Sequence, residues 1–137
     1  MTYELHRLEE ALVVRWLATP TREAATAVAG ELELALRAAK SPPALWIIID
    51  SDRSDLPAPD ARTVLQSKAR FLFELAGSVD VVMIGEGLRA SLMRTFLRTM
   101  ALVTRTRDRV HVHDDVDQAV RGRGLDPKLV AAIRGSA

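Results

Sequence analysis

Residues 44–50 read Ala44-Leu45-Trp46-Ile47-Ile48-Ile49-Asp50, and this stretch decides the fold class. It is a short, uninterrupted apolar run with Pro42 and Pro43 before it and acidic residues at its end. A run of this length, rich in β-branched and aromatic residues, is typical of a strand that is covered on both faces. We therefore expect a central strand with helices packed on the sheet.

Strands and helices alternate on both sides of this central strand. Residues 3–5 and 12–17 predict a hairpin around Glu9 and Glu10, and Thr19 or Thr21 predicts the start of a helix that ends near Ala39. After residue 50 we expect a polar loop and then these elements: a helix over 59–76 ended by Gly77, a strand over 79–84, a helix over 88–102, a strand around 110–112, a short helix over 116–121 and a helical tail over 128–133.

Parallel neighbouring strands need crossover connections, so this order predicts an α/β fold with a mixed, mainly parallel sheet of about five strands flanked by helices. We expect a single domain over residues 1–124, followed by a tail over 125–137 with a short helix. Two of the expected helices have a broad apolar inner face. On the second helix that face is Ala61, Val64, Leu65, Phe71, Leu72, Leu75 and Ala76, and on the third it is Leu88, Leu92, Met93, Phe96, Leu97 and Met100.

The composition excludes several classes of protein. The 137 residues contain no Cys, which excludes disulfide scaffolds and Cys-based metal sites. The formal net charge of +1 argues against a dedicated nucleic-acid binder. We expect no transmembrane segment and no signal peptide, and therefore a cytoplasmic protein. The charge is divided, because residues 1–87 carry 9 basic and 13 acidic side chains whereas residues 88–137 carry 10 and 5.

The order of elements over residues 3–124 resembles the STAS domain, named for sulfate transporters and anti-sigma factor antagonists. The segments that carry the resemblance are the hairpin ending in residues 10–17, the helix after Thr19-Pro20, the strand over 45–50, the strand over 79–84 with Gly85 and the arginine-bearing helix behind it. Residues 109–120 are similar to the ending of bacterial STAS-like and SEC14-like small proteins.

This resemblance implies a non-catalytic regulatory domain that binds a protein partner, such as a regulator or a kinase, and that needs no cofactor. In the family a control serine lies at the start of the helix after the central strand, but residues 55–60 here contain neither Ser nor Thr. Asp60 supplies a constant negative charge there, or is simply a first-turn acid of the helix. We predict a partner-binding surface made of Asp52, Ser54, Asp55, Asp60 and Arg62.

A second surface is predicted to be basic. Arg94 and Arg98 lie opposite the expected apolar side of the third helix, Arg105 and Arg107 follow it, and no acid occurs between Arg89 and Arg107. Guanidinium groups suit the carboxylates of an acidic partner or the phosphates of anionic lipid. The alternative is an ordinary solvated helix face.

Other functions stay open. The SEC14-like resemblance implies a carrier or sensor of a lipid or other apolar ligand, with Leu92, Met93, Phe96, Leu97 and Met100 around the ligand. Asp50 and Asp52, with Asp114 and Asp115, could support a Mg²⁺-dependent phosphotransferase, although the lysine and hydroxyl of that chemistry are missing after Ile84.

His111 and His113 share one side of a strand but are better explained as solvent-facing residues than as metal ligands, because Arg107 and Arg109 lie on the same side. We expect no metal. A homodimer through an edge strand or an exposed Phe73 also stays open.

Overall fold

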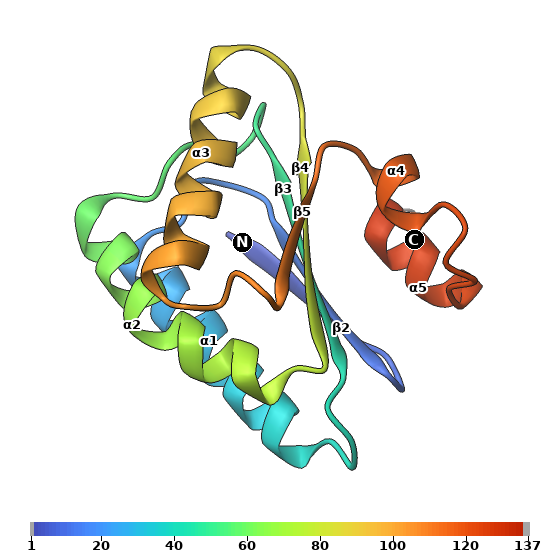
Figure 1. Cartoon of the computed structure of the whole chain (residues 1–137). Helices are drawn as coiled ribbons and strands as arrows, with labels where there is room; N and C mark the ends of the chain where they lie inside the picture. The colour runs from blue at the N-terminus through green and yellow to red at the C-terminus, as the bar shows by residue number, and fades with distance from the viewer. Residues whose placement is uncertain (1, 136–137) are drawn as a thin grey trace.

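The central strand predicted from residues 44–50 is β3 (Ala44–Asp50) of a five-stranded sheet. The computed structural model describes residues 2–135. Within them the strand order is β1-β2-β3-β4-β5, with these bounds: β1 Tyr3–Arg7, β2 Ala11–Trp16, β4 Ser78–Ile84 and β5 Val110–His113 (Figure 1). β1 pairs antiparallel with β2, and the other pairs are parallel. The predicted hairpin and the mixed, mainly parallel sheet are confirmed.

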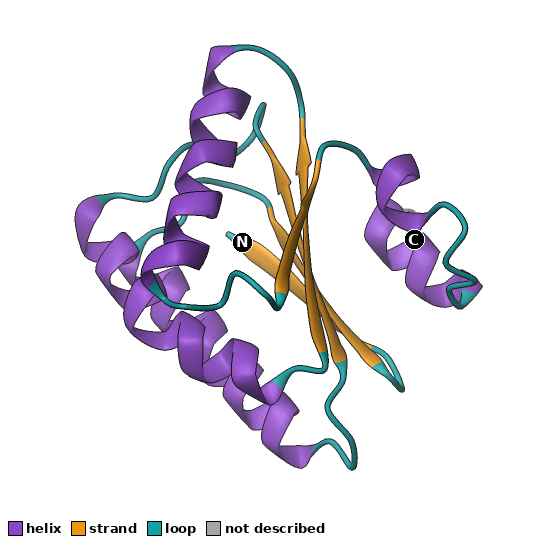
Figure 2. Cartoon of the chain, in the orientation of Figure 1, coloured by secondary structure: helices purple, strands orange, loops and turns teal. Residues whose placement is uncertain are grey.

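Helices cover both faces of this sheet. Three long helices lie on one face, and two short ones lie on the other (Figure 2). The long helices are α1 (Arg22–Ala38), α2 (Pro59–Leu75) and α3 (Leu88–Val103), and the short ones are α4 (Val116–Val120) and α5 (Pro127–Arg134). Successive residues of a strand point to opposite faces, so β3 contributes to both layers. Leu45 and Ile49 pack under the long helices, whereas Trp46 and Ile48 pack under α4 and α5.

The C-terminal helix is part of this packing. Leu129 and Ile133 of α5 are buried in the same cluster as Val13 and Trp46. Arg15 of β2 donates hydrogen bonds to the carbonyls of Ala132, at 3.0 Å, and Ile133. Partial burial lowers the pKa of the Arg15 guanidinium. The last turn of α5 is therefore tied to a strand near the other end of the chain.

Thr21 is the N-cap of α1, because its hydroxyl accepts a hydrogen bond from the backbone N–H of Ala24 at 3.1 Å. Of the two threonines predicted as possible N-caps, Thr21 is therefore the one that caps the helix. The hydroxyl of Thr19 instead accepts a hydrogen bond from the N–H of Asp55.

Gly77 follows α2 as predicted, but not as a left-handed cap, because Ala76 and the chain after it are extended. A Cβ at Gly77 would lie 2.7 Å from the carbonyl oxygen of Pro42. The glycine is needed for this close approach of two backbone segments.

Two expectations about helix faces are wrong. On α2, Phe71 is exposed beneath the Arg37 guanidinium, 4.9 Å from the ring centroid, whereas Phe73 packs against the core. On α3, Leu88 and Leu92 are 78% and 51% exposed. Only Met93, Leu97 and their neighbours on that side reach the sheet, because α3 also presents a second apolar face outward.

No helix within residues 2–135 is both long enough and apolar enough to cross a bilayer.

Candidate partner-binding surface

The loop over residues 51–58 leaves β3 at the carboxyl edge of the sheet, where ligands commonly bind in α/β folds. Its first residue is held to the neighbouring strand, since the N–H of Ser51 donates to the carbonyl of Ile84 at 2.8 Å. Gly85 follows Ile84 with φ of +116°, and a Cβ there would lie 2.0 Å from Ser51 Oγ. Only glycine allows the two strand ends to meet this closely.

The middle of the loop is tied to the chain before α1. Ser54 Oγ donates to the carbonyl of Ala18 at 2.9 Å, and the N–H of Asp55 donates to Thr19 Oγ1 at 2.9 Å. Ser54 is 1% exposed. The expectation that Ser54 contacts a partner is therefore corrected, because its hydroxyl is used inside the protein.

The other side of the loop is held by Arg89 in the first turn of α3. Its Nη1 donates to the carbonyl of Ser51 at 3.2 Å, and its Nε lies 3.8 Å from Asp55 Oδ2. About half of each of these two charged side chains is exposed. Arg89 was not among the residues predicted for this surface, although its place two residues after Gly87 is visible in the sequence.

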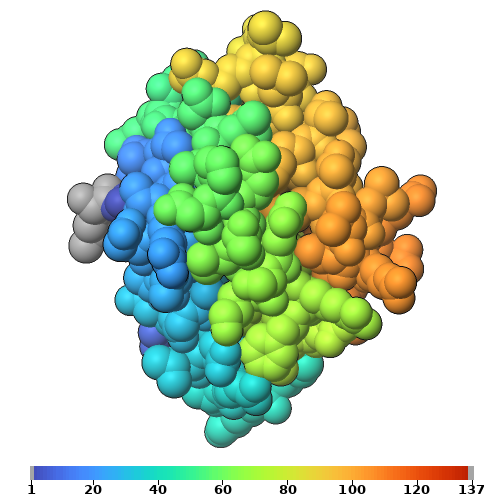
Figure 3. Space-filling model, turned by 90° about the vertical axis from the view of Figure 1, so that its left-hand side faces the viewer, coloured from blue at the N-terminus to red at the C-terminus, as the bar shows by residue number. Residues whose placement is uncertain are grey.

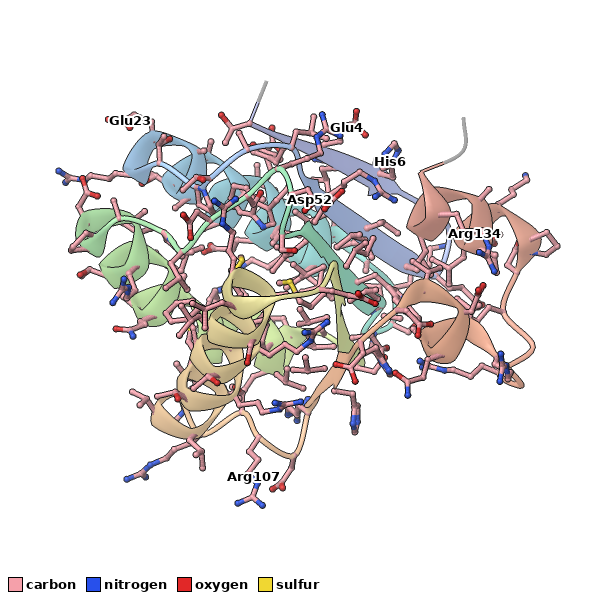
Figure 4. The ribbon with its side chains drawn as sticks, turned by 90° about the horizontal axis from the view of Figure 1, so that it is seen from above. Glu4, His6, Glu23, Asp52, Arg107 and Arg134 are labelled. Carbon is pink, nitrogen blue, oxygen red and sulfur yellow. The ribbon has the colours of Figure 1, made fainter. Side chains whose placement is uncertain are left out.

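Asp52 and Asp60 are the freely exposed acids of this region. The N–H of Asp52 donates to Asp50 Oδ1 at 2.9 Å, which turns the chain and leaves the Asp52 carboxylate outside. Asp60 lies in the first turn of α2, where the helix dipole favours a negative charge. The labelled Asp52 extends from the loop end of the sheet in Figure 4.

Arg62, which was predicted to contact a partner, directs its guanidinium toward the protein itself. Its Nη2 donates to the carbonyl of Pro57 at 3.2 Å, and its guanidinium carbon lies 5.4 Å from the centroid of the Phe96 ring. Its Nε is buried without a hydrogen-bond partner. Arg62 thus joins the loop to α3, and Asp52, Asp55, Asp60 and Arg89 form what we call the loop surface.

The predicted basic surface is divided by the structure. Arg94 is half-buried, and its Nη2 donates to the carbonyl of Gly85 at 3.0 Å. Its Nε lies 2.9 Å from Asp114 Oδ1 without hydrogen-bond alignment. Its expected place on the outer face of α3 is therefore corrected. Arg98, Arg105 and Arg107 are exposed, and Figure 4 shows Arg107 well away from Asp52.

A buried charge cluster lies on the other face of the sheet and was not predicted from the sequence. Asp80 of β4 is 1% exposed, and His113 Nε2 lies 2.8 Å from its Oδ1. Arg123 also bonds this carboxylate and lies over Trp46. The His113 ring stacks on Trp46, so the expectation that it faces solvent is wrong, whereas His111 is exposed. The available signal was a lone acid in an apolar strand.

An apolar cavity of about 120 Å³ lies between the sheet, α2 and α3. Met93, Phe96, Leu97 and Met100 line it, as the carrier hypothesis expects, but Leu92 does not. Sites for drug-sized ligands usually occupy roughly 300 Å³ or more. The cavity therefore has most of the lining residues that the carrier hypothesis expects, but it is smaller than a site for a drug-sized ligand.

The two acids considered as additional ligands for phosphotransfer, Asp114 and Asp115, are engaged elsewhere. Asp114 faces Arg94, and the Asp115 carboxylate caps α4 by accepting from the N–H of Gln118 at 2.6 Å. Between residues 2 and 135 there is no group of three or more His, Asp or Glu side chains placed to hold a metal. This geometry gives the phosphotransfer hypothesis no support.

No protein-family model matches the chain, and no curated protein matches it. Chains of solved structures do match it, and two of them are forms of SpoIIAA. The anti-sigma factor antagonist SpoIIAA in its unphosphorylated form is 15% identical, with a TM-score of 0.53 over 90% of this chain and 99% of that one. The Bacillus cell fate determinant SpoIIAA in the phosphorylated form is 14% identical, with a TM-score of 0.51 over 88% and 99%. The chain therefore has the STAS fold of SpoIIAA, as the order of its elements predicted.

Proposed function

We propose that this chain is a non-catalytic, STAS-like regulatory domain that binds a protein partner through the loop surface. SpoIIAA, which shares the fold, is by its name an antagonist of an anti-sigma factor. A regulator or a kinase is the class of partner that this likeness suggests.

The observation that carries the proposal is the anchoring of the loop. Ser54, the N–H of Asp55 and Arg89 hold it to the segment before α1 and to α3 through contacts between distant parts of the chain. A loop that is already ordered loses little conformational entropy when it binds. Its exposed carboxylates at Asp52 and Asp60 are then presented in a fixed arrangement, which suits recognition of a basic patch on a partner.

We further propose that this surface works without phosphorylation. The loop and helix start over residues 50–60 contain two hydroxyl side chains, Ser51 and Ser54, and these are 3% and 1% exposed. A kinase cannot reach such buried groups without unfolding the loop. The negative charge of Asp52 and Asp60 is permanent, so binding would be controlled by the partner or by the amount of this protein.

The proposal is tested by charge reversal. Affinity capture from the source cells would compare the unaltered protein with the triple variant Asp52→Lys, Asp55→Lys and Asp60→Lys, with captured proteins quantified by mass spectrometry. The matched control is Glu9→Lys, Glu10→Lys and Asp108→Lys, which makes the same change in net charge at exposed positions outside the loop.

We expect a specific partner to be lost from the first variant and kept by the control. Circular dichroism must show that both variants are folded. The same partners captured by all three proteins would remove the loop surface as the binding site.

A further inference from the structure

Helix α3 has two apolar faces, and only one of them is used by the fold. Ala90, Met93 and Ala101 are its buried residues, and Met93 packs in the core cluster with the strands. On the outer side Leu88, Leu92 and Leu102 are 78%, 51% and 59% exposed, and Val103 beside them is 66% exposed. Figure 3 shows the yellow-to-orange surface of this helix next to the green surface of α2, open to the viewer. Exposed apolar side chains gathered on one helix face mark an interaction site.

The spacing of this outer face is that of a helix–helix seam. Leu88, Leu92, Thr95, Thr99 and Leu102 follow one another at intervals of four, three, four and three residues. Residues at alternating intervals of three and four form one narrow stripe, into which a second helix packs at a small crossing angle. We call these five residues the outer seam.

The two threonines at its centre fit a partner helix better than a lipid surface. Thr95 and Thr99 are exposed, and the hydroxyl of Thr95 donates to the carbonyl of Ser91 at 3.1 Å. Its hydrogen bond is therefore satisfied within α3, and its methyl group is available for packing. Helices that lie on membranes usually insert larger side chains such as Trp, Phe and Leu along the whole apolar face.

The charges beside the seam define the partner further. Arg98 occupies a position that flanks a seam of this spacing, and Arg105 follows directly after the C-cap of α3; both are exposed. Neither has an ion-pair partner among residues 2–135. No acid occurs between Arg89 and Arg107. A second copy of α3 would bring further arginines to this positive surface, whereas a helix with acidic flanking residues would neutralise it.

We propose that the outer seam of α3 is a docking site for an amphipathic helix of another protein, with an apolar stripe flanked by Asp or Glu. The outer seam shares no residue with the loop surface, although Arg89 of that surface lies in the first turn of α3 between Leu88 and Leu92. The protein would then hold two partner segments at once, or one partner through two contacts.

The probe for this proposal is a synthetic peptide of about three heptads, with Leu along its seam and Glu at the flanking positions. Two control peptides have the same length: one with Lys in place of Glu, and one with the first composition scrambled. Fluorescence anisotropy measures binding of each to the full chain. We expect the Glu peptide to bind and the Lys and scrambled peptides to bind at least tenfold more weakly.

Variants then assign the contact. Leu92→Ser with Leu102→Ser should weaken binding of the Glu peptide about tenfold or more, equivalent to about 1.4 kcal/mol. Leu34→Ser is the control, because Leu34 is 70% exposed outside the seam, and this variant should leave binding of the Glu peptide unchanged. Arg98→Glu with Arg105→Glu should lose the Glu peptide and gain the Lys peptide. All five positions changed in these variants are exposed, so the variants are expected to fold.

Other occupants give other results. Equal binding of the scrambled peptide, or unchanged binding by the double variants, would overturn the proposal. Dimerisation in sedimentation experiments that is lost in the leucine variant would assign the seam to a second copy instead. Co-sedimentation with phosphatidylserine vesicles, without peptide binding, would assign it to a lipid surface. The loop-surface triple variant should still bind the Glu peptide, so failure of one proposal is distinguishable from failure of the other.

Discussion

The Arg123 guanidinium donates two hydrogen bonds to the carboxylate of Asp80, from Nη1 to Oδ1 at 3.0 Å and from Nη2 to Oδ2 at 3.3 Å. The same guanidinium lies 5.0 Å from the Trp46 ring centroid. Paired hydrogen bonds of this kind are among the strong ones, and here the acid is almost fully buried. The turn between α4 and α5 is thereby fixed to β4 of the sheet.

Arg123→Ala should destabilise the protein by about 3 kcal/mol, because it leaves the buried Asp80 charge with only His113 beside it. Urea unfolding measures the change in the free energy of unfolding. Arg121→Ala is the matched control, since its side chain is exposed two residues earlier, and it should change stability by less than about 0.5 kcal/mol. Similar effects of the two substitutions would show that the ion pair contributes little.

Two glycines should respond to alanine in opposite directions. Gly77→Ala would place a Cβ against the Pro42 carbonyl and should cost about 1–3 kcal/mol. Gly30→Ala, inside α1 with no atom within 4 Å of the added Cβ, should stabilise by about 0.5–1 kcal/mol through helix propensity. Thermal unfolding of the two variants checks both signs. A neutral Gly77→Ala would mean that the chain near Pro42 shifts easily.

Arg94→Ala should lower the free energy of unfolding by about 2 kcal/mol, because its side chain bonds the carbonyl of Gly85 and faces Asp114. Arg98→Ala, one turn further along α3, should be close to neutral because its side chain is exposed. Chemical unfolding separates the two. Equal changes in the free energy of unfolding for the two variants would show that Arg94 belongs to the exposed basic surface, as predicted from sequence.

We expect the stabilising contribution of Tyr3 to the folded protein to be lost at alkaline pH. Desolvation, and then its hydrogen bond to Glu31 at 2.9 Å, raise the pKa of Tyr3 above its ordinary value near 10. The folded state holds this proton more tightly, so the contribution is complete below about pH 10 and falls as pH rises through the folded pKa. The stability difference between the unaltered protein and Tyr3→Phe should therefore shrink above about pH 10.

Tyr3 is the sole tyrosine of the chain, so the ultraviolet absorbance of tyrosinate reports its ionisation directly. Titration of the folded protein at or below the ordinary value would contradict this prediction.

The order of elements was predictable because both faces of β3 and β4 are buried. Apolar runs such as residues 44–49 leave little choice of structure when helical patterns lie on either side. Likewise the loop after β3 was recognisable from its charge and its place at the end of a buried strand.

The details of the candidate site were less predictable, because they depend on contacts between residues far apart in sequence. Ser54 is a polar loop residue by every local criterion, but its hydroxyl bonds a carbonyl 36 residues away. Helical periodicity placed Arg94 on the outer side of α3, yet its long side chain reaches back to the carbonyl of Gly85 after β4 and to Asp114. The partners of Asp80 lie 33 and 43 residues from it.

The attachment of α5 to β2 also bears on how the chain folds during synthesis. The hydrogen bond from Arg15 to Ile133 spans 118 residues, and the cover over Trp46 comes from α4 and α5, the last elements of the fold. While the ribosome makes β1 to β5, one face of the sheet has no partner and presents Trp46, Ile48 and Val82 to water or to a chaperone. Completion of this domain therefore waits for its final helix, and a chain shortened before α5 would display an apolar sheet face to the quality-control machinery of the cell.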